Sequence, residues 1–155
     1  MSKRKILSIV VIMIITLNLF GCSSKDNNGY FNNIKWFTSF SEVEKSIKNK
    51  YVQPDRKDVI MEIINDFDNI VGTQIWIAYE FDNEKLSKII STPMIITDKT
   101  KISNDEMQYK LYQAFIDKYG EYDEEKDNRY IWNKKYSKIT LYKSNSYYFM
   151  YEPIK

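Results

Sequence analysis

Five carboxylates stand within seven residues in the C-terminal third of the chain, at Glu121, Asp123, Glu124, Glu125 and Asp127. Carboxylate-rich loops bind Ca²⁺ when ligands occupy alternate positions and a glycine makes the turn between them. Residues 121–127 contain no glycine and do not follow that spacing. We interpret the segment as a solvated acidic loop, and the sequence predicts neither a metal site nor a cofactor.

Side chains for covalent catalysis are scarce. The chain has no histidine and one cysteine, which excludes Ser–His–Asp triads, Cys–His proteases and the common zinc sites. A Ser-x-x-Lys motif occurs only at Ser2 and Lys5, within the first five residues of the chain. Two carboxylates that hydrolyse a glycosidic bond are set opposite each other by the fold rather than by sequence spacing. We therefore expect a non-catalytic protein, with a small carboxylate-dependent hydrolase of envelope polymers as the alternative.

Aromatic residues make up 15% of the chain and include 13 tyrosines. In the run Tyr147-Tyr148-Phe149-Met150-Tyr151, both faces of a strand would be aromatic or apolar. One face has to cover the core, so the other is either covered as well or exposed as a binding surface. We single out Tyr148, together with Trp76 of an earlier segment, as a candidate surface for an envelope protein or a glycan.

Cys22, the only cysteine, follows a segment typical of protein export. Residues 2–5 are basic at three positions, and the fifteen residues 6–20 are mostly apolar. Fifteen residues are fewer than the roughly 20 that span a bilayer, but they suit a signal peptide. With Leu19-Phe20-Gly21 before the cysteine, the segment resembles the bacterial lipoprotein signal. The alternatives are an uncleaved anchor, or a secretory signal with the cysteine near the cut by chance.

The resemblance implies cleavage before Cys22 and a diacylglyceryl group on its thiol. Residues 1–21 are then the signal peptide, and residues 22–35 are the lipidated cysteine and a flexible tether, in which Tyr30 and Phe31 are the residues that could already contact the domain or the membrane interface. Two acyl chains hold a protein stably, so we expect anchoring at the outer face of the cell membrane. Cleavage removes three of the 23 basic residues and leaves 20 against 21 acidic ones. That balance lacks the basic footprint of nucleic-acid binding.

Two Ser-x-x-Glu capping boxes organise the rest of the chain, one beginning at Ser41 and one at Ser103. The first predicts a helix over about 42–50, with Val43, Ile47 and Tyr51 along one side. The second predicts a longer helix that ends before Gly120. Its apolar stripe consists of Met107, Leu111, Ala114, Phe115 and Tyr119.

Strand-like segments follow each helix. Residues 74–81 alternate, with Ile75, Ile77, Tyr79 and Phe81 on one face and Trp76, Ala78 and Glu80 on the other. A four-residue turn at 82–85 leads into a strand over 86–96. Residues 129–132, 139–142 and 147–151 are three further strands, and residues 144–146 are a turn. Residues 59–67 suit either a helix or a strand, and periodicity does not decide between them.

The motifs also occur in an order found in one group of proteins. Trp36 comes before Ser41-Glu42-Val43, and Val71-Gly72-Thr73, the segment 79–86, Asp117-Lys118-Tyr119-Gly120 and Trp132 follow. This order resembles small lipoproteins of low-GC Gram-positive bacteria, typically clostridia. Those proteins are similar in layout to β-lactamase inhibitor protein and to the small outer-membrane-assembly lipoproteins. The resemblance covers residues 36–153, implies that 59–67 is a strand, and carries over no catalytic residue.

We therefore expect one α+β domain over residues 36–155, with two halves at 36–98 and 99–155. The expected order is α-β-β-β-α-β-β-β, with the helices packed on one face of an antiparallel sheet. The expected function is that of a non-catalytic binding module on the outer face of the membrane.

Overall fold

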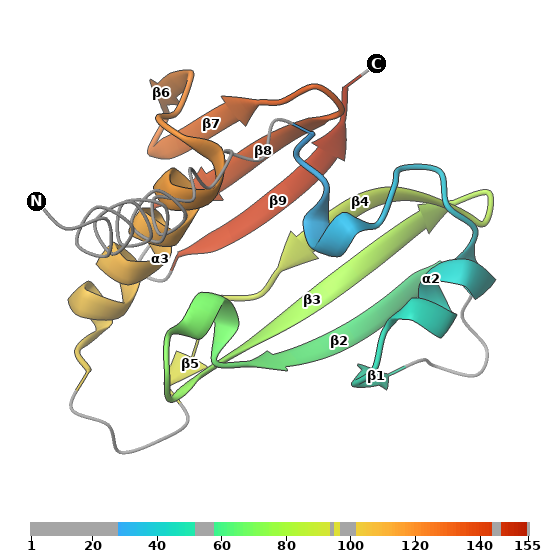
Figure 1. Cartoon of the computed structure of the whole chain (residues 1–155), viewed down its shortest axis with the longest axis horizontal. Helices are drawn as coiled ribbons and strands as arrows, with labels where there is room; N and C mark the ends of the chain where they lie inside the picture. Colours follow the sequence, from blue (N-terminus) through green and yellow to red (C-terminus); the bar gives the residue numbers. More distant parts are fainter. Residues whose placement is uncertain (1–27, 52–57, 94, 97–101, 144–146, 155) are drawn as a thin grey trace, which may run out of the picture.

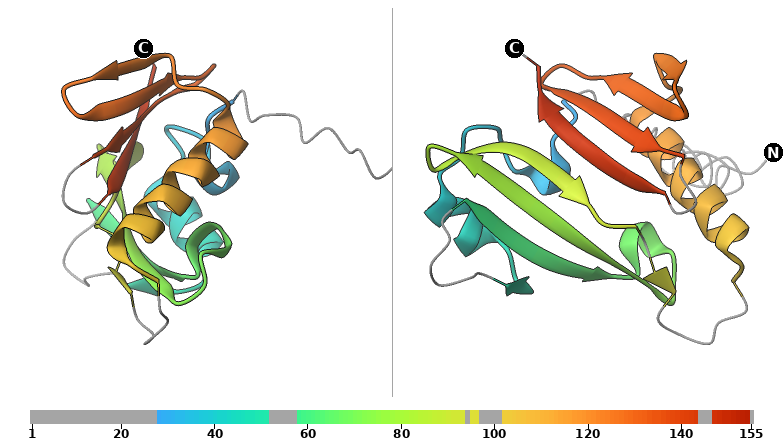
Figure 2. Two further views of the ribbon diagram at one scale, coloured as in Figure 1. Left: turned by 90° about the vertical axis from the view of Figure 1, so that its left-hand side faces the viewer. Right: turned by 180° about the vertical axis from the view of Figure 1, so that it is seen from behind.

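The computed structural model describes residues 28–51, 58–93, 95–96, 102–143 and 147–154. It is an α+β fold in which one antiparallel sheet carries two α-helices on the same face (Figures 1 and 2). The elements in chain order are η1 (Phe31–Asn33), α2 (Phe40–Ser46), β1 (Lys50–Tyr51), β2 (Val59–Asn65), η2 (Phe67–Asn69), β3 (Thr73–Asp82), β4 (Lys85–Ser91), β5 (Ile95–Ile96), α3 (Asn104–Tyr119), β6 (Glu124–Lys126), β7 (Arg129–Asn133), β8 (Ser137–Tyr142) and β9 (Tyr148–Pro153).

The strands lie in the order β1-β2-β3-β4-β9-β8-β7-β6, and β5 pairs with the first residues of β3. Strands β4 and β9, the last long strand of each half, therefore meet in the middle of the sheet. In the described residues they share two antiparallel pairs, Ile89 with Tyr151 and Ile90 with Met150. Beyond these pairs, the backbone N–H of Phe149 donates to the buried Ser91 hydroxyl at 2.8 Å. The junction between the two halves is thus short.

Helix α3 begins and ends where the sequence predicts. The Ser103 hydroxyl accepts a hydrogen bond from the Glu106 backbone N–H at 3.2 Å. Gly120 follows the helix with φ +84°, and its N–H donates to the Ile116 carbonyl at 2.8 Å. Of the predicted stripe, Met107, Leu111, Phe115 and Tyr119 are buried, and Ala114 is half-buried.

The first helix is shorter than predicted and begins earlier. Its capping residue is Ser39, because Ser39 and Glu42 also fit Ser-x-x-Glu; the Ser39 N–H donates to the Glu42 carboxylate at 3.1 Å. Helix α2 covers Phe40–Ser46 instead of 42–50. Val43 and Ile47 are buried as predicted, but Tyr51 lies in strand β1 and is exposed. The chain leaves the helix after two turns, so Tyr51 cannot extend the stripe.

The strands confirm the predicted alternation in most places. Residues 59–65 form a strand, as the resemblance implied, and the 3-10 turn η2 replaces its predicted end. Ile75, Ile77, Tyr79 and Phe81 of β3 are all buried. The turn between β3 and β4 has two residues instead of four, Asn83 and Glu84, both with positive φ. The predicted strand 86–96 is interrupted after Ser91 and resumes as the short β5.

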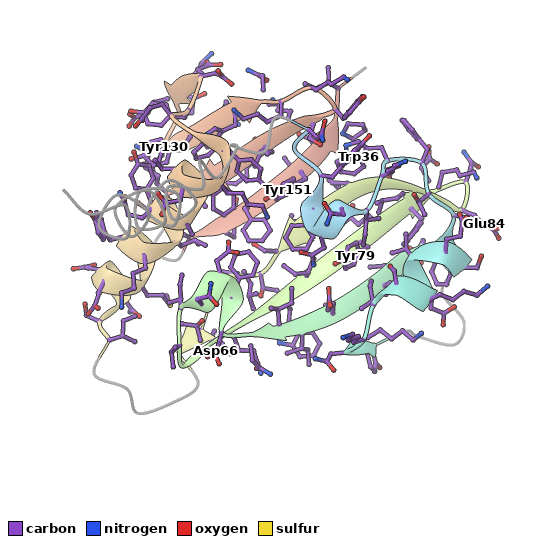
Figure 3. All side chains as sticks on the ribbon, in the orientation of Figure 1. Trp36, Asp66, Tyr79, Glu84, Tyr130 and Tyr151 are labelled. Carbon is purple, nitrogen blue, oxygen red and sulfur yellow. The ribbon has the colours of Figure 1, made fainter. Side chains whose placement is uncertain are left out.

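The predicted tether is partly wrong. Phe31 is 1% exposed, and its ring lies 5.8 Å from that of Phe149 and 5.3 Å from that of Tyr151. Tyr79, 6.2 Å from the Phe31 ring, and Tyr151 occupy the middle of the molecule on β3 and β9 (Figure 3). Residues 28–35 therefore belong to the domain, because one aromatic side chain in this polar segment fills the core between the halves. Residues 1–27, including Cys22, lie outside the described residues.

Candidate functional site

The sheet face opposite the helices, the outer face, carries a continuous row of mostly apolar side chains. Cross-strand pairs join Met61 to Ala78, Ala78 to Ile90, Ile90 to Met150, Met150 to Thr140, and Thr140 to Ile131. We call these six residues the apolar row. One member comes from each of six neighbouring strands, and Figure 2 shows both α-helices on the other side of the sheet. Met61, Ala78, Ile90 and Met150 are half-buried, whereas Thr140 and Ile131 are buried.

Trp76 and Tyr148, the residues singled out in the sequence, both belong to the outer face. Each is half-buried and alternates with buried neighbours, Ile75 and Ile77 for Trp76 and Phe149 for Tyr148. They lie on β3 and β9, with β4 between these strands. The fold thus places the two residues on one face but on separate strands.

Tyr142 is a residue of this face that the sequence analysis missed. It pairs with Tyr148 across β8 and β9, and the two rings stack at 4.4 Å with an interplanar angle of 5°. The Arg129 guanidinium lies 5.9 Å from the Tyr142 ring. The sequence contains the information needed to predict this pair, because the predicted turn at 144–146 places positions 142 and 148 opposite each other on neighbouring strands. We call Trp76, Tyr148, Tyr142 and Arg129 the aromatic row.

A charged row borders the apolar row on its other side. The Lys88 ammonium lies 2.7 Å from the Glu80 carboxylate, and this hydrogen bond raises the pKa of Lys88. On the adjoining strands, Lys138 pairs with Glu152. The charged row therefore consists of Glu80, Lys88, Glu152 and Lys138, with negative and positive charges alternating along it. Each side chain has a residue of opposite charge opposite it on a neighbouring strand.

A cavity of about 540 Å³ lies at the β1–β2 end of the outer face. It is lined by Met61 and Ala78 of the apolar row, by Glu80 of the charged row, and by Tyr51, Asp58, Val59, Phe81 and Ser87. A hollow beside a flat apolar surface can take one large side chain from a partner.

Part of the acidic segment 121–127 is a strand rather than the predicted loop, because Glu124–Lys126 form β6, which pairs with β7 in a hairpin. Glu125 contacts the Lys143 ammonium and accepts a hydrogen bond from Tyr122 at 3.0 Å; both bonds lower its pKa, that of Lys143 most. Asp127 pairs with Arg129 at 2.9 Å, and Asp123 accepts from the Asn133 N–H at 2.5 Å. In the part of the chain that the structure describes, no three His, Cys, Asp or Glu residues converge on a metal-sized site.

A second cavity, of about 510 Å³, is lined by two carboxylates, Glu62 and Asp68. Desolvation raises the pKa of Asp68, and nearby Lys118 opposes that shift. Glu62 accepts a hydrogen bond at 2.7 Å from the hydroxyl of Tyr79, whose side chain is fully buried. Burial, followed by this bond to Glu62, raises the pKa of Tyr79 strongly.

The raised pKa of Tyr79 predicts a loss of stability at alkaline pH. An unfolded tyrosine ionises near pH 10, whereas buried Tyr79 stays neutral, so its contribution is intact below pH 10 and lost above it. From pH 9 to pH 11 this effect amounts to about 1.4 kcal/mol. In urea denaturation, Tyr79→Phe should therefore lose less stability over this interval than the wild type. Tyr109→Phe, at an exposed position of α3, is the matched control; a wild-type slope in Tyr79→Phe would contradict the assignment.

Among the residues described, neither helix has the length and apolar character needed to cross a bilayer. Compared with models of protein families, with curated proteins and with solved structures, the chain matches none of them.

Proposed function

We propose that this protein is a lipid-anchored, extracytoplasmic module that binds another envelope protein through its outer face, without catalysis. The observation that carries the proposal is the part of the apolar row that solvent reaches, Met61, Ala78, Ile90 and Met150 on β2, β3, β4 and β9, which lies between the aromatic row and the charged row. Protein interfaces have this anatomy, with an apolar centre, aromatic anchors and a polar rim.

The composition of the outer face favours a protein over a glycan as the ligand. Met61 and Met150 have flexible, polarisable side chains that adapt to an irregular partner surface. The charged row can fix the orientation of a partner through complementary charges. The cavity at the β1–β2 end offers a place for one anchoring side chain from that partner.

The alternative function, hydrolysis by two carboxylates, could use Glu62 and Asp68, which line one cavity, or Asp58 and Glu80, which line the other. Glu80 is engaged in the ion pair with Lys88. The raised pKa of Asp68 suits a general acid. Glu62, however, is already hydrogen-bonded to the core through Tyr79. We favour binding because catalysis by Glu62 would require its hydrogen bond with Tyr79 to break, whereas binding through the outer face requires no such change.

We also infer that the two halves repeat one structural unit. The sequence predicted α-β-β-β twice, and the observed halves are α2-β1-β2-β3-β4, followed by the short β5, and α3-β6-β7-β8-β9. In both halves a strand of two or three residues at the sheet edge precedes three longer strands. The mirrored strand order about the β4–β9 junction supports this inference.

Membrane anchoring is tested at Cys22. A bacterial host grown with a fatty-acid probe should label the wild-type protein and retain it in the membrane fraction, because two acyl chains bind stably. Cys22→Ala should be unlabelled and should leave that fraction or accumulate with its leader uncleaved. A wild-type protein without label would contradict the proposed anchor.

Binding through the outer face is tested with Met150→Lys, which places a charge in the middle of the apolar row. Chemical crosslinking on intact cells should trap the wild-type protein with a partner, and this adduct should fall about tenfold or more in Met150→Lys. Tyr109→Lys introduces the same charge at an exposed position on α3, on the opposite side of the sheet, and should keep the adduct. Equal adducts from both variants, each shown to be folded by denaturation, would contradict the proposed surface.

A further inference from the structure

Three distant segments meet where the described chain begins. The backbone N–H of Tyr136, in the β7–β8 connection, donates to the Asn28 carbonyl at 3.2 Å. The N–H of Ile154, after β9, donates to the Tyr136 carbonyl, also at 3.2 Å. The rings of Tyr30 and Tyr136 stack at 5.1 Å and 8°. These contacts hold the start of the domain against one end of the sheet.

Trp36 brings a further segment to the same place. Its indole N–H donates to the Ser137 hydroxyl at 2.8 Å, next to Tyr136, and Figure 3 shows Trp36 at this end of the sheet. Its neighbours Lys35 and Phe37 are exposed. We call Tyr30, Lys35, Phe37, Lys135, Tyr136 and Ile154 the entry corner.

The entry corner exposes more apolar surface than the fold requires. Phe37 is 62% exposed, Ile154 46% and Tyr136 37%. Phe37 also has φ +64°, a conformation that a bulky residue adopts only at a cost, and its N–H is held by the Leu86 carbonyl at 3.1 Å. The fold thus keeps a strained aromatic residue turned toward solvent, which points to a contact outside the domain.

The charges of the entry corner are basic. Lys35 and Lys135 are exposed, and the Lys135 ammonium lies 4.8 Å from the centre of the Tyr136 ring. Lysines attract anionic lipid headgroups by about 1 kcal/mol each near the surface. Aromatic residues such as Tyr and Trp prefer the headgroup level of a bilayer, and exposed aliphatic side chains can bury there. The combination fits the surface of an anionic membrane.

The length of the chain puts this surface within reach. Cys22 stands six residues before Asn28. Six residues span at most about 20 Å in any conformation. If Cys22 carries acyl chains in the bilayer, Asn28 cannot lie farther than that from the membrane, and Tyr136 of the entry corner is hydrogen-bonded to Asn28.

We propose that the entry corner contacts the anionic lipid surface and so fixes the orientation of the domain on the membrane. This inference rests on the acylation of Cys22 in the proposed function. The occupant of the entry corner is the lipid surface, whereas the partner protein occupies the outer face.

The test uses full-length, acylated protein with one added cysteine, which is the only free thiol when Cys22 is acylated. Lys135→Cys reports on the entry corner. Val71→Cys is the control, because Val71 is 68% exposed and precedes the first residue of β3. The entry corner lies near the other end of β3, where Phe81 pairs with Leu86 and the Leu86 carbonyl binds the N–H of Phe37. The nine residues from Thr73 to Phe81 extend over about 27 Å. Lys35→Cys is a second reporter in case Lys135→Cys does not fold.

The measurement is the rate at which a bulky maleimide modifies each cysteine in vesicles of phosphatidylglycerol and phosphatidylcholine. We expect the rate at Lys135→Cys to be about tenfold lower than at Val71→Cys in vesicles, and the two rates to agree within about twofold in detergent. The acylation of Cys22 is checked by mass spectrometry. If Cys22 is acylated and the two rates are equal in vesicles, or are slowed equally at both positions, the proposed orientation is wrong but the anchor is not. A Cys22 without acyl chains would overturn both the anchor and this inference.

Discussion

Phe149→Ala is expected to lower the free energy of unfolding by about 3–5 kcal/mol, as emptying a buried aromatic site does. Phe149 is fully buried on β9, in the middle of the sheet. Its ring lies 5.3 Å from those of Phe67 and Phe115, and near that of Phe31. Since the three neighbouring rings come from three separate segments, η2, α3 and η1, the structure cannot close over the cavity by a local shift.

Tyr148→Ala is the matched control, one residue away on the other face of the same strand. It removes the stacking with Tyr142, so about 1 kcal/mol is expected. Urea or guanidinium denaturation of both variants measures the difference. Equal, large losses would show that the outer face is buried as well, and a reversed ranking would show that the register of β9 is wrong by one residue.

Phe31→Ala is expected to cost a similar amount, about 3–5 kcal/mol, although it lies in a segment that resembles a linker. The Phe31 ring contacts Phe67 and Phe149 and meets Tyr79 and Tyr151 edge to face, so it touches both halves of the sheet. Chemical denaturation of the domain that begins at residue 28 measures this loss.

Lys35→Ala is the control for Phe31→Ala, because Lys35 is exposed four residues further along the same segment. It should change the stability by less than about 0.5 kcal/mol. A domain that begins at residue 34 should be destabilised as much as Phe31→Ala. If that truncated domain were as stable as the longer one, residues 28–33 would be a tether after all.

The parts of the fold that local patterns determine could be predicted from the sequence. Each of these features depends on residues close together in the chain. They are the Ser103 cap and helical period of α3, the alternation of β3, and the hairpin in which Ile139 and Leu141 pair with Tyr151 and Phe149. Such patterns record which face is buried, and burial is the dominant favourable term in folding.

Other features depend on contacts that no local pattern contains. Ser39 and Ser41 both begin a Ser-x-x-Glu box, and only the packing of Val43 and Ile47 decides between them. Phe31 lies beside Tyr30 in a short segment rich in asparagine, and its partners lie on η2, β3 and β9. The apolar row can be recognised only when the order of six strands in the sheet is known. In that order β4 lies next to β9, which pairs Ile89 with Tyr151, 62 positions later in the chain. The alternation of each strand therefore predicts that Trp76 and Tyr148 lie on the side away from the core, but it does not predict that they belong to the same surface.

The place of Phe31 has a consequence for how the chain folds during synthesis. Its partners include Phe149, 118 residues later and close to the C-terminus. The individual hairpins form from nearby residues, but the aromatic centre cannot assemble until the last strand is available. A chain whose last strand has not yet been synthesised therefore lacks a complete core and is not compactly folded. If the protein is exported as we propose, such an incompletely folded chain suits passage through a narrow translocation pore, and its core would be completed only after the C-terminal strand had crossed.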